Sequence, residues 1–367
     1  MTNRWDDYSL TFEGSHDSLE AAWEEAGTAC GGKRSMLVLG VGFDPRALAA
    51  LRLFLALKHK MTPLVGLIRL PPPSESGNRG SVAMAEDNQQ AFDGLTSQVD
   101  VREIPHQDVL SPPSAGPRIA RALTDPTFVE GVGHLIVDIS SLPASLYFPT
   151  VTAVLRAVDE GRAEFPAEVQ VVACENPAID ARIRELGIGP ASVLGGYRHV
   201  LDRESGPHGT TIWAPVVGEH SGPALRAIHE FLEPADVCPI LPFPARDPRR
   251  ADNLLLELQV ELLDMFGVTP GNLIYADERN PFDLYRTLTR VHEKYVHALH
   301  VLGPTTVALS THSSKLLSLG ALLAAHEHAL PVVAAPALDY EVETEELADL
   351  EVTNQVTCAW LTGVPYR

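Results

Sequence analysis

The sequence has few cysteines, and no two of them stand at a metal-binding spacing. Its 367 residues include only Cys30, Cys174, Cys238 and Cys358, and none lies in a CxxC pair. Structural zinc sites usually need such pairs, and disulfide scaffolds are short chains rich in cysteine. The sequence therefore predicts reduced thiols, no metal site and a cytoplasmic location.

Long apolar runs are also missing. No segment approaches the roughly 18 consecutive apolar residues that a membrane helix needs. The N-terminal segment, MTNRWDDYSLTFEG, is polar and acidic, and it lacks the apolar core of a signal peptide. We expect neither a membrane span nor a membrane partner.

Basic residues are scarce. The chain has 28 Lys and Arg against 48 Asp and Glu, a formal net charge of −20. Duplex DNA is therefore disfavoured as a partner, because a phosphate backbone is bound by a basic surface. A local pocket can still hold a small anion. No P-loop, GxSxG elbow or matched set of metal ligands is present, so no catalytic residue is predicted.

What the sequence does contain is an alternation of buried strands and helices. Hydrophobic residues make up 45% of the chain, and apolar runs that read as strands alternate with amphipathic segments. Strands are predicted over 36–41, 63–70, 99–104, 134–140, 169–174, 237–243, 272–276, 305–310 and 330–335. Helices are predicted over 18–26, 45–60, 145–161, 176–187, 248–267, 281–303 and 314–329. This pattern predicts an α/β fold whose parallel sheets are covered on both faces.

The pattern restarts in the second half, which suggests two Rossmann-like halves related by internal duplication. Asp44-Pro45-Arg46 matches Asp247-Pro248-Arg249, each between a strand and a helix, and Ser140 matches Ser310. The predicted organisation is an N-terminal extension (1–35), half 1 (36–190), a connector with its own strand and helix (191–235), and half 2 (236–367) with an acidic C-terminal segment. A chance likeness between βα units is the alternative.

The turn after the first strand, GVGFDPR, is the first candidate binding site. Gly40 and Gly42 allow the backbone to approach a ligand. Arg46 follows in the first turn of the next helix, where an anion or an interface carboxylate is the expected partner and a solvated side chain is the alternative. The turn resembles the GxGxDxR motif of one class of S-adenosylmethionine-dependent methyltransferases. The acidic residue that holds the ribose is missing, because the next strand ends IRLPPP.

Hydroxyl-rich turns after two later strands are the second candidate. Ser140 and Ser141 follow one strand, and Ser310, Thr311, Ser314 and Lys315 follow another. Such turns can donate side-chain and backbone hydrogen bonds to a phosphate at the carboxyl end of a sheet. Arg249 at the start of another helix is added by the internal match. Ordinary helix N-capping by serine and threonine is the alternative.

The segment VALSTHSSKLLSLGALLAAHE resembles the strand, turn and helix of CARF domains, Rossmann-like sensors of cyclic oligonucleotides in CRISPR and related antiviral systems. VCPILPFPARDPRRADNLLLELQ is similar to the opening of such domains, and the resemblance covers about 237–340. It implies that Ser310, Thr311, Ser314 and Lys315 line a ligand. His312 and Ser313 stand where the family's turn has glycines.

Three functional hypotheses follow. The first is a cytosolic sensor in a bacterial defence system that binds a nucleotide or phosphate ligand and acts through a partner protein carrying the effector activity. Ligand binding would bias the arrangement of the two halves. The second is an enzyme that holds S-adenosylmethionine or a related cofactor at GVGFDPR. The third is a scaffold in a protein complex whose ligand sites are lost. No cofactor is assigned.

Overall fold

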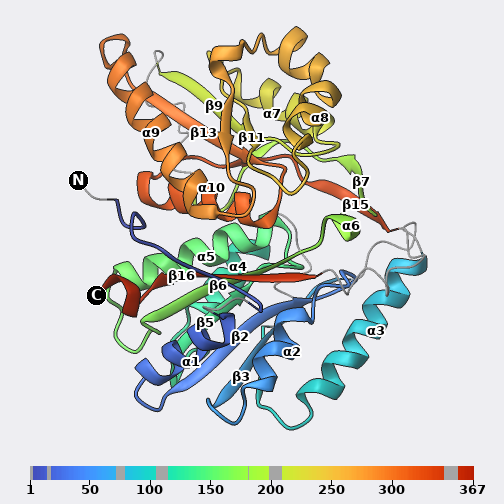
Figure 1. Cartoon of the computed structure of the whole chain (residues 1–367), viewed down its shortest axis with the longest axis vertical. Helices are drawn as coiled ribbons and strands as arrows, with labels where there is room; N and C mark the ends of the chain where they lie inside the picture. Colours follow the sequence, from blue (N-terminus) through green and yellow to red (C-terminus); the bar gives the residue numbers. More distant parts are fainter. Residues whose placement is uncertain are drawn as a thin grey trace. The chain divides into compact units, whose positions relative to one another are not determined.

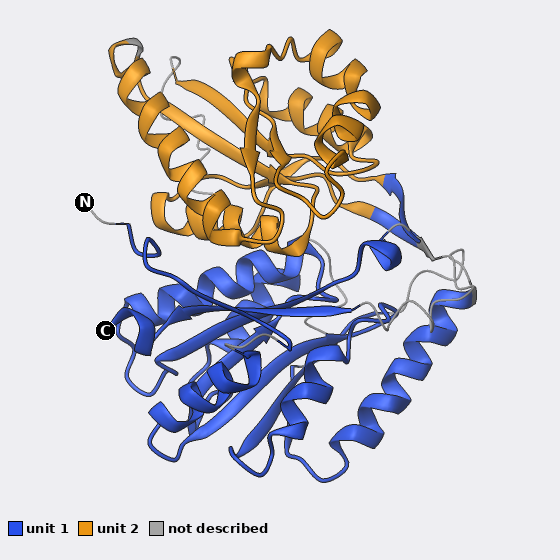
Figure 2. Cartoon of the chain, in the orientation of Figure 1, with its two compact units in different colours: residues 1–187, 338–367 blue, residues 188–337 orange. Residues whose placement is uncertain are grey.

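The structure is a computed structural model. It describes residues 3–14, 18–71, 79–104, 115–180, 182–197, 209–342 and 354–367. Most of the expected proline-rich loop over 71–81 and most of the acidic run over 339–351 lie outside these residues. The chain forms two units (Figure 2): Met1–Gly187 with Leu338–Arg367 make unit 1, and Ile188–Ala337 make unit 2.

Unit 1 is built on a seven-stranded sheet in the order β1-β16-β6-β5-β2-β3-β4. Its five parallel strands are β2 (Arg34–Val41), β3 (Pro63–Arg69), β4 (Val101–Glu103), β5 (Val132–Asp138) and β6 (Glu168–Glu175). The C-terminal strand β16 (Gln355–Thr362) adds antiparallel to β6, and β1 (Ser9–Phe12) adds antiparallel to β16. Numbered along the chain, the parallel strands lie in the order 3-2-1-4-5, which is that of a Rossmann half.

Helices cover both faces of this sheet (Figure 1). Helices α1 (Leu19–Ala29), α2 (Ala49–Ala56) and α3 (Arg79–Thr96) share one apolar cluster with β2 and its neighbours. Helices α4 (Ala115–Leu123) and α5 (Ala144–Asp159) lie together on the other face. The short helices α6 (Pro177–Asp180) and η8 (Val364–Tyr366) follow β6 and β16.

Unit 2 repeats this strand order on a smaller scale. Its central strand is β9 (Thr210–Val216). On one side β10 (Asp236–Val237) and β11 (Ile240–Pro242) pair with β9 in a single register, and β12 (Ile274–Ala276) forms the edge. On the other side lies β13 (Thr305–Thr311), and Val332, just before β14 (Val333–Ala334), bridges to Leu309. All these pairings are parallel, so the order is again 3-2-1-4-5.

The helices of unit 2 also form two layers. Helices α7 (Gly222–Leu232) and α8 (Arg250–Glu257) and the π-helix η4 (Val260–Met265) share an apolar cluster with β9 and β11. Helices α9 (Pro281–Leu299) and α10 (Lys315–His328) pack on each other and on β13. Short elements complete the unit: β8 (Ser192–Val193), η5 (Pro270–Asn272) and η6 (His300–Leu302).

The predicted α/β fold with two parallel sheets is confirmed, whereas one of the two internal matches is wrong. Ser140 lies just after β5 and Ser310 near the end of β13, and each of these strands is the fourth parallel strand of its unit, so this match agrees with the common strand order. The triplets do not correspond: Asp44-Pro45-Arg46 follows the first strand, β2, whereas Asp247-Pro248-Arg249 follows the second, β11. Any strand–Asp-Pro-helix junction gives the same local signal, because Asp and Pro both favour helix starts.

The unit boundaries differ from the predicted ones. The expected connector over 191–235 contains β9 and α7, the first strand and helix of unit 2. The expected extension over 1–35 supplies β1 and α1 to unit 1, and the C-terminal part of the expected half 2 supplies β16 to the same unit. Pairing between the two chain ends, at Leu10 and Ala359 for example, joins segments too distant in sequence for local patterns to connect.

Two predicted helices are interrupted. The segment 176–187 forms only the short α6 and then β7 (Ile183–Ile188), which pairs with β15 (Ala337–Val342). The segment 248–267 divides into α8 and the π-helix η4. None of the helices in the described residues is long and apolar enough to cross a membrane.

Candidate functional site

The candidate ligand site of each unit lies at the carboxyl ends of the first and fourth parallel strands. In open α/β sheets, ligands bind where the strand order reverses, between the first strand and the fourth. In unit 1 this point lies between the turns that follow β2 and β5, and in unit 2 between those that follow β9 and β13. Five of the predicted ligand residues lie on these turns: Gly42, Arg46, Ser140, Ser141 and Ser314. Four lie in the flanking elements, Gly40 in β2, Ser310 and Thr311 in β13 and Lys315 at the start of α10, whereas Arg249 precedes α8, away from these turns.

In unit 1, side chains of the protein fill the space between the turns that follow β2 and β5. Ser141 Oγ donates a hydrogen bond to the Gly40 carbonyl at 2.7 Å. A β-carbon on Gly40 would lie 2.5 Å from Leu142 Cδ2 and 3.2 Å from Ser141 Oγ. Leu142 is fully buried. The absence of a side chain at Gly40 therefore makes room for Leu142 rather than for a ligand.

Ser140 is engaged in holding β5 to β6. Its hydroxyl donates to Asp138 Oδ1 and accepts from the Cys174 backbone N–H at 2.7 Å. Its own N–H donates to Asp138 at 2.9 Å, and the residue is fully buried. Burial, as the largest cause, also raises the pKa of the neighbouring Cys174 thiol far above its ordinary value, so this cysteine stays protonated.

Arg46 is paired with carboxylates on three of its nitrogen atoms. Its Nε and Nη2 donate to Asp44 at 3.0 and 2.9 Å, and Nη1 donates to Asp180 at 2.6 Å. Burial disfavours the charged guanidinium, but the two carboxylates outweigh it and hold the pKa of Arg46 above its ordinary value. Arg46 is therefore bound by carboxylates of unit 1 itself.

Gly42, the other glycine of the turn, packs against the segment after β3. A β-carbon there would lie 3.1 Å from Leu70 Cβ. Asn88, on α3, donates to the carbonyl oxygens of Gly42 and Asp44 at 2.8 and 2.9 Å. The strand β3 ends at Arg69, which pairs with Glu103 of β4.

In unit 2 the turn after β13 lies directly against the loop after β9. A β-carbon on Gly218 would stand 1.7 Å from the His312 carbonyl oxygen, and the His312 N–H donates to Val216 O at 2.8 Å. Ser310 is fully buried and accepts a hydrogen bond from Trp213 Nε1 at 3.1 Å. Ser310 therefore stabilises the sheet and does not face the turn.

Two polar atoms of this turn are buried without a hydrogen-bond partner among the residues that the structure describes. They are His312 Nε2 and Ser313 Oγ. Burial lowers the pKa of His312 to about 4, so its imidazole is neutral near pH 7. Ser314 Oγ accepts from Leu317 N at 3.3 Å and caps α10. Ser314 is therefore an ordinary helix N-cap, the alternative that the sequence offered for this serine. Thr311 and Lys315 lie half-buried beside it.

The other helix N-terminus at this end of unit 2 already holds an anion. The Glu261 carboxylate, from η4, sits beside Gly222, whose β-carbon would be 2.9 Å from Oε1. Glu261 is buried and forms an ion pair with Arg226. The start of α7, where a Rossmann half often binds a phosphate, is thus occupied by a side chain of the protein.

Arg250, which the sequence analysis missed, connects three loops of unit 2. Its Nε and Nη2 each donate to Glu219 at 2.8 Å, and Nη1 pairs with the buried Glu278. Glu219, Arg250 and Glu278 follow β9, β11 and β12. Arg249, the predicted ligand residue, is exposed at the start of α8, where its backbone N–H donates to Asp247 Oδ1 at 2.9 Å. Only the fold places these three charged residues together, and no local motif marks them.

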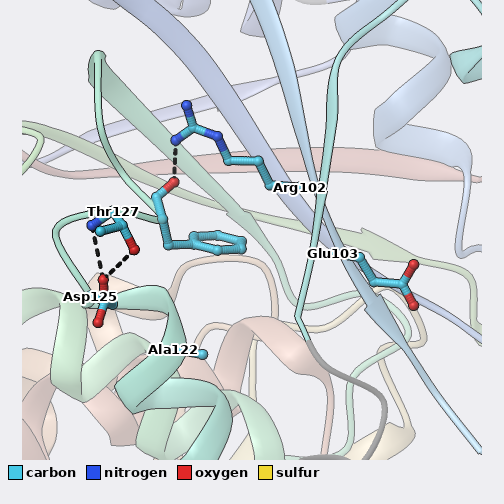
Figure 3. Close-up of a pocket in the computed structure, with 6 residues that line it drawn as sticks. Arg102, Glu103, Ala122, Asp125 and Thr127 are labelled. Atoms are coloured by element: carbon cyan, nitrogen blue, oxygen red, sulfur yellow. Dashed lines mark hydrogen bonds between the residues drawn. The ribbon is translucent and has the colours of Figure 1, made fainter.

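A separate hollow of about 470 Å³ lies at the edge of unit 1, beside β4 and α4. Figure 3 shows its lining residues, with Arg102 donating to the Phe128 carbonyl and Asp125 accepting from Thr127. Glu103, which also lines it, pairs with Arg69 of β3. Among the described residues, no group of three or more His, Cys, Asp or Glu is placed to hold a metal ion.

Comparisons with known proteins give little more. No family model matches the chain, and no curated protein matches it. The solved structure of a putative universal stress protein from Pseudomonas aeruginosa UCBPP-PA14 is 14% identical and covers 88% of this chain and 98% of its own, with a TM-score of 0.24. A structural similarity with that TM-score gives no information about the function of this chain.

Proposed function

We propose that unit 2 binds a small anionic ligand, of nucleotide or phosphate type, at the turn between β13 and α10. The observation that carries the proposal is the pair of buried atoms, His312 Nε2 and Ser313 Oγ, without a partner in the described chain. A buried polar group without a hydrogen bond costs about 1–3 kcal/mol. A ligand that bonds to both would remove that cost.

The chemistry of the turn favours an anion. The first turn of α10 presents backbone N–H groups and the positive end of a 14-residue helix. Lys315 adds a positive charge at the first helical position, and Ser313 adds a hydroxyl. A neutral imidazole at His312 can donate one hydrogen bond to a phosphate oxygen or to a base.

The finer proposal, a sensor that acts through a partner protein, rests on the resemblance to CARF domains. It names cyclic oligonucleotides as the first ligands to test and antiviral defence as the context. Unit 1 has the corresponding turn, but Ser140, Ser141 and Leu142 are used there for packing and internal hydrogen bonds. We therefore assign the site to unit 2 alone.

A thermal-shift screen of the full chain tests the proposal against its alternatives. The ligands are cyclic oligonucleotides, linear nucleotides, NAD and S-adenosylmethionine. A ligand at about 100 times its dissociation constant adds roughly 2.7 kcal/mol, which for domains of this size raises the melting temperature by several degrees. We expect a shift with a cyclic or linear nucleotide that Gly42→Val leaves intact.

Two other outcomes would contradict the proposal. A shift with S-adenosylmethionine alone, abolished in Gly42→Val, would favour a cofactor-dependent enzyme that uses the GVGFDPR turn. No shift with any of the ligands would favour a scaffold without a ligand site.

A further inference from the structure

An apolar stripe runs along the outward face of α8 and η4 in unit 2. Leu256, Val260 and Leu263 are 71%, 57% and 48% exposed. All three lie on the solvent side of the segment that α8 and η4 form. Leu254, Leu258 and Leu262 lie on the opposite face and are buried in the core of the unit. The stripe therefore points away from the core.

The stripe lies on a local departure from regular helix geometry. Residues Val260–Met265 form a π-helix, and Met265 is half-exposed at its end. Such segments are rare and occur frequently at functional sites. Single exposed apolar residues are normal on protein surfaces, but a row of them on the solvent side of one helical segment is the pattern of a helix-binding face.

The charged residues within the segment 251–265 are all acidic. Asp252, Glu257 and Asp264 are exposed there, and the exposed Arg249 lies at the start of α8. No Lys or Arg occurs between Arg250 and Arg279. A partner with basic side chains around an apolar row would complement this face. A second copy of the same acidic chain would instead bring like charges together.

We propose that this face docks a basic amphipathic helix of a partner protein. Leucines of the partner would pack between Leu256, Val260 and Leu263, and its Lys or Arg residues would meet the flanking carboxylates. The proposal is independent of the ligand site at the β13–α10 turn, because it rests on a different element and a different chemistry.

The test uses the full chain and a fluorescently labelled synthetic peptide. The peptide is an amphipathic helix of about 18 residues built of leucine and lysine, and its control is a scrambled peptide of the same composition. We expect anisotropy to show binding of the helix but not of the scrambled sequence. Affinity falls as sodium chloride rises from about 50 to about 500 mM, because the flanking charges become screened.

Matched variants assign the binding to the stripe. The double variant Leu256→Ser, Leu263→Ser should bind the peptide with an affinity lower by about tenfold or more, because two apolar contacts are lost. Val301→Ser, a change at another exposed valine of unit 2, is the control and should bind like the wild type. All these side chains are exposed, so the melting temperature of each variant should match the wild type.

Three results would overturn the proposal. Equal binding by the wild type and the double variant would show adsorption of a basic peptide to an acidic protein. Absence of binding up to millimolar peptide would show that no basic helix docks there. A dimer in light scattering that the double variant abolishes would assign the face to a second copy of the chain.

Discussion

Gly218 and His312 are in such close contact that a β-carbon on the glycine would lie 1.7 Å from the histidine carbonyl oxygen. The contact joins the loop after the first strand of unit 2 to the turn after the fourth. It fixes the position of the turn that carries Ser313 and Lys315. The proposed ligand site therefore depends on a glycine that lies outside the turn, in the loop after β9.

Gly218→Ala should destabilise unit 2 and displace this turn. The new methyl group meets backbone atoms, which cannot move aside as a side chain can, and overpacking of this kind costs about 1–3 kcal/mol. Gly271→Ala is the control, because its β-carbon would meet only Thr269 Oγ1, at 3.9 Å. Urea unfolding followed by circular dichroism measures both. Equal midpoints for the two variants would refute the role given to Gly218.

Ser310 and Ser313 should respond differently to alanine although they lie three residues apart. Ser310→Ala leaves the buried Trp213 indole N–H without its acceptor, and we expect a loss of about 1–3 kcal/mol. Ser313→Ala removes a buried hydroxyl that has no partner among the described residues, so the free protein should be as stable as the wild type or slightly more stable. Thermal unfolding of the two variants without ligand separates these cases, and a large loss in Ser313→Ala would show that its hydroxyl is structural.

The two Asp-Pro-Arg triplets give a matched pair of arginines. Arg46→Ala removes the guanidinium that pairs with the Asp44 carboxylate, which is only 9% exposed. Breaking a buried pair in this way costs about 3–5 kcal/mol. Arg249→Ala removes an exposed side chain and should change stability by no more than about 0.5 kcal/mol. Comparable losses in the two variants, measured by urea unfolding, would contradict this assignment.

The stability of unit 1 should fall as the pH drops below about 6.5, in part through His134. This histidine is fully buried between Ser35 Oγ and Gln170 Oε1, and burial lowers its pKa to about 4. Between pH 6.5 and 4 the unfolded chain therefore binds a proton that the folded chain does not. The contribution is fully present above pH 6.5 and is lost towards pH 4, by up to about 1.4 kcal/mol per pH unit.

His134→Gln tests this dependence against the background of titrating carboxylates. The variant should show a shallower loss of unfolding free energy between pH 6.5 and 4 than the wild type. His59→Gln, at an exposed position, should keep the slope of the wild type. Identical slopes in all three proteins would mean that His134 is protonated as readily in the folded state as in the unfolded chain.

The sequence predicted the parallel strands well because each is a short apolar run between turns. The run over 134–140, for example, is β5, whose seven residues are all buried. It did not predict β7, since the segment ARIRELG has helical character and forms a strand only through pairing with β15. It also missed β9 as the first strand of unit 2, because that strand lies within a segment without a clear boundary signal.

The sequence predicted where the hydroxyl-rich turns lie but not the contacts that their side chains make. Hydroxyl-rich turns do follow the fourth strand of each unit, as expected. Whether a serine there faces a ligand or the protein depends on contacts such as Ser141 with Gly40 and Ser310 with Trp213, which a single sequence does not encode locally. His312 and Ser313 were noted only as replacements of glycine, yet they carry the unpaired buried atoms.

Titration calorimetry of Lys315→Ala with cyclic oligonucleotides tests the central claim most directly. We predict that the wild type binds, that Lys315→Ala weakens binding by about tenfold or more without lowering the melting temperature of the free protein, and that Lys294→Ala, at an exposed lysine of α9, binds like the wild type. Equal affinity in all three proteins, or no heat with any of the oligonucleotides, would contradict a ligand site at the β13–α10 turn.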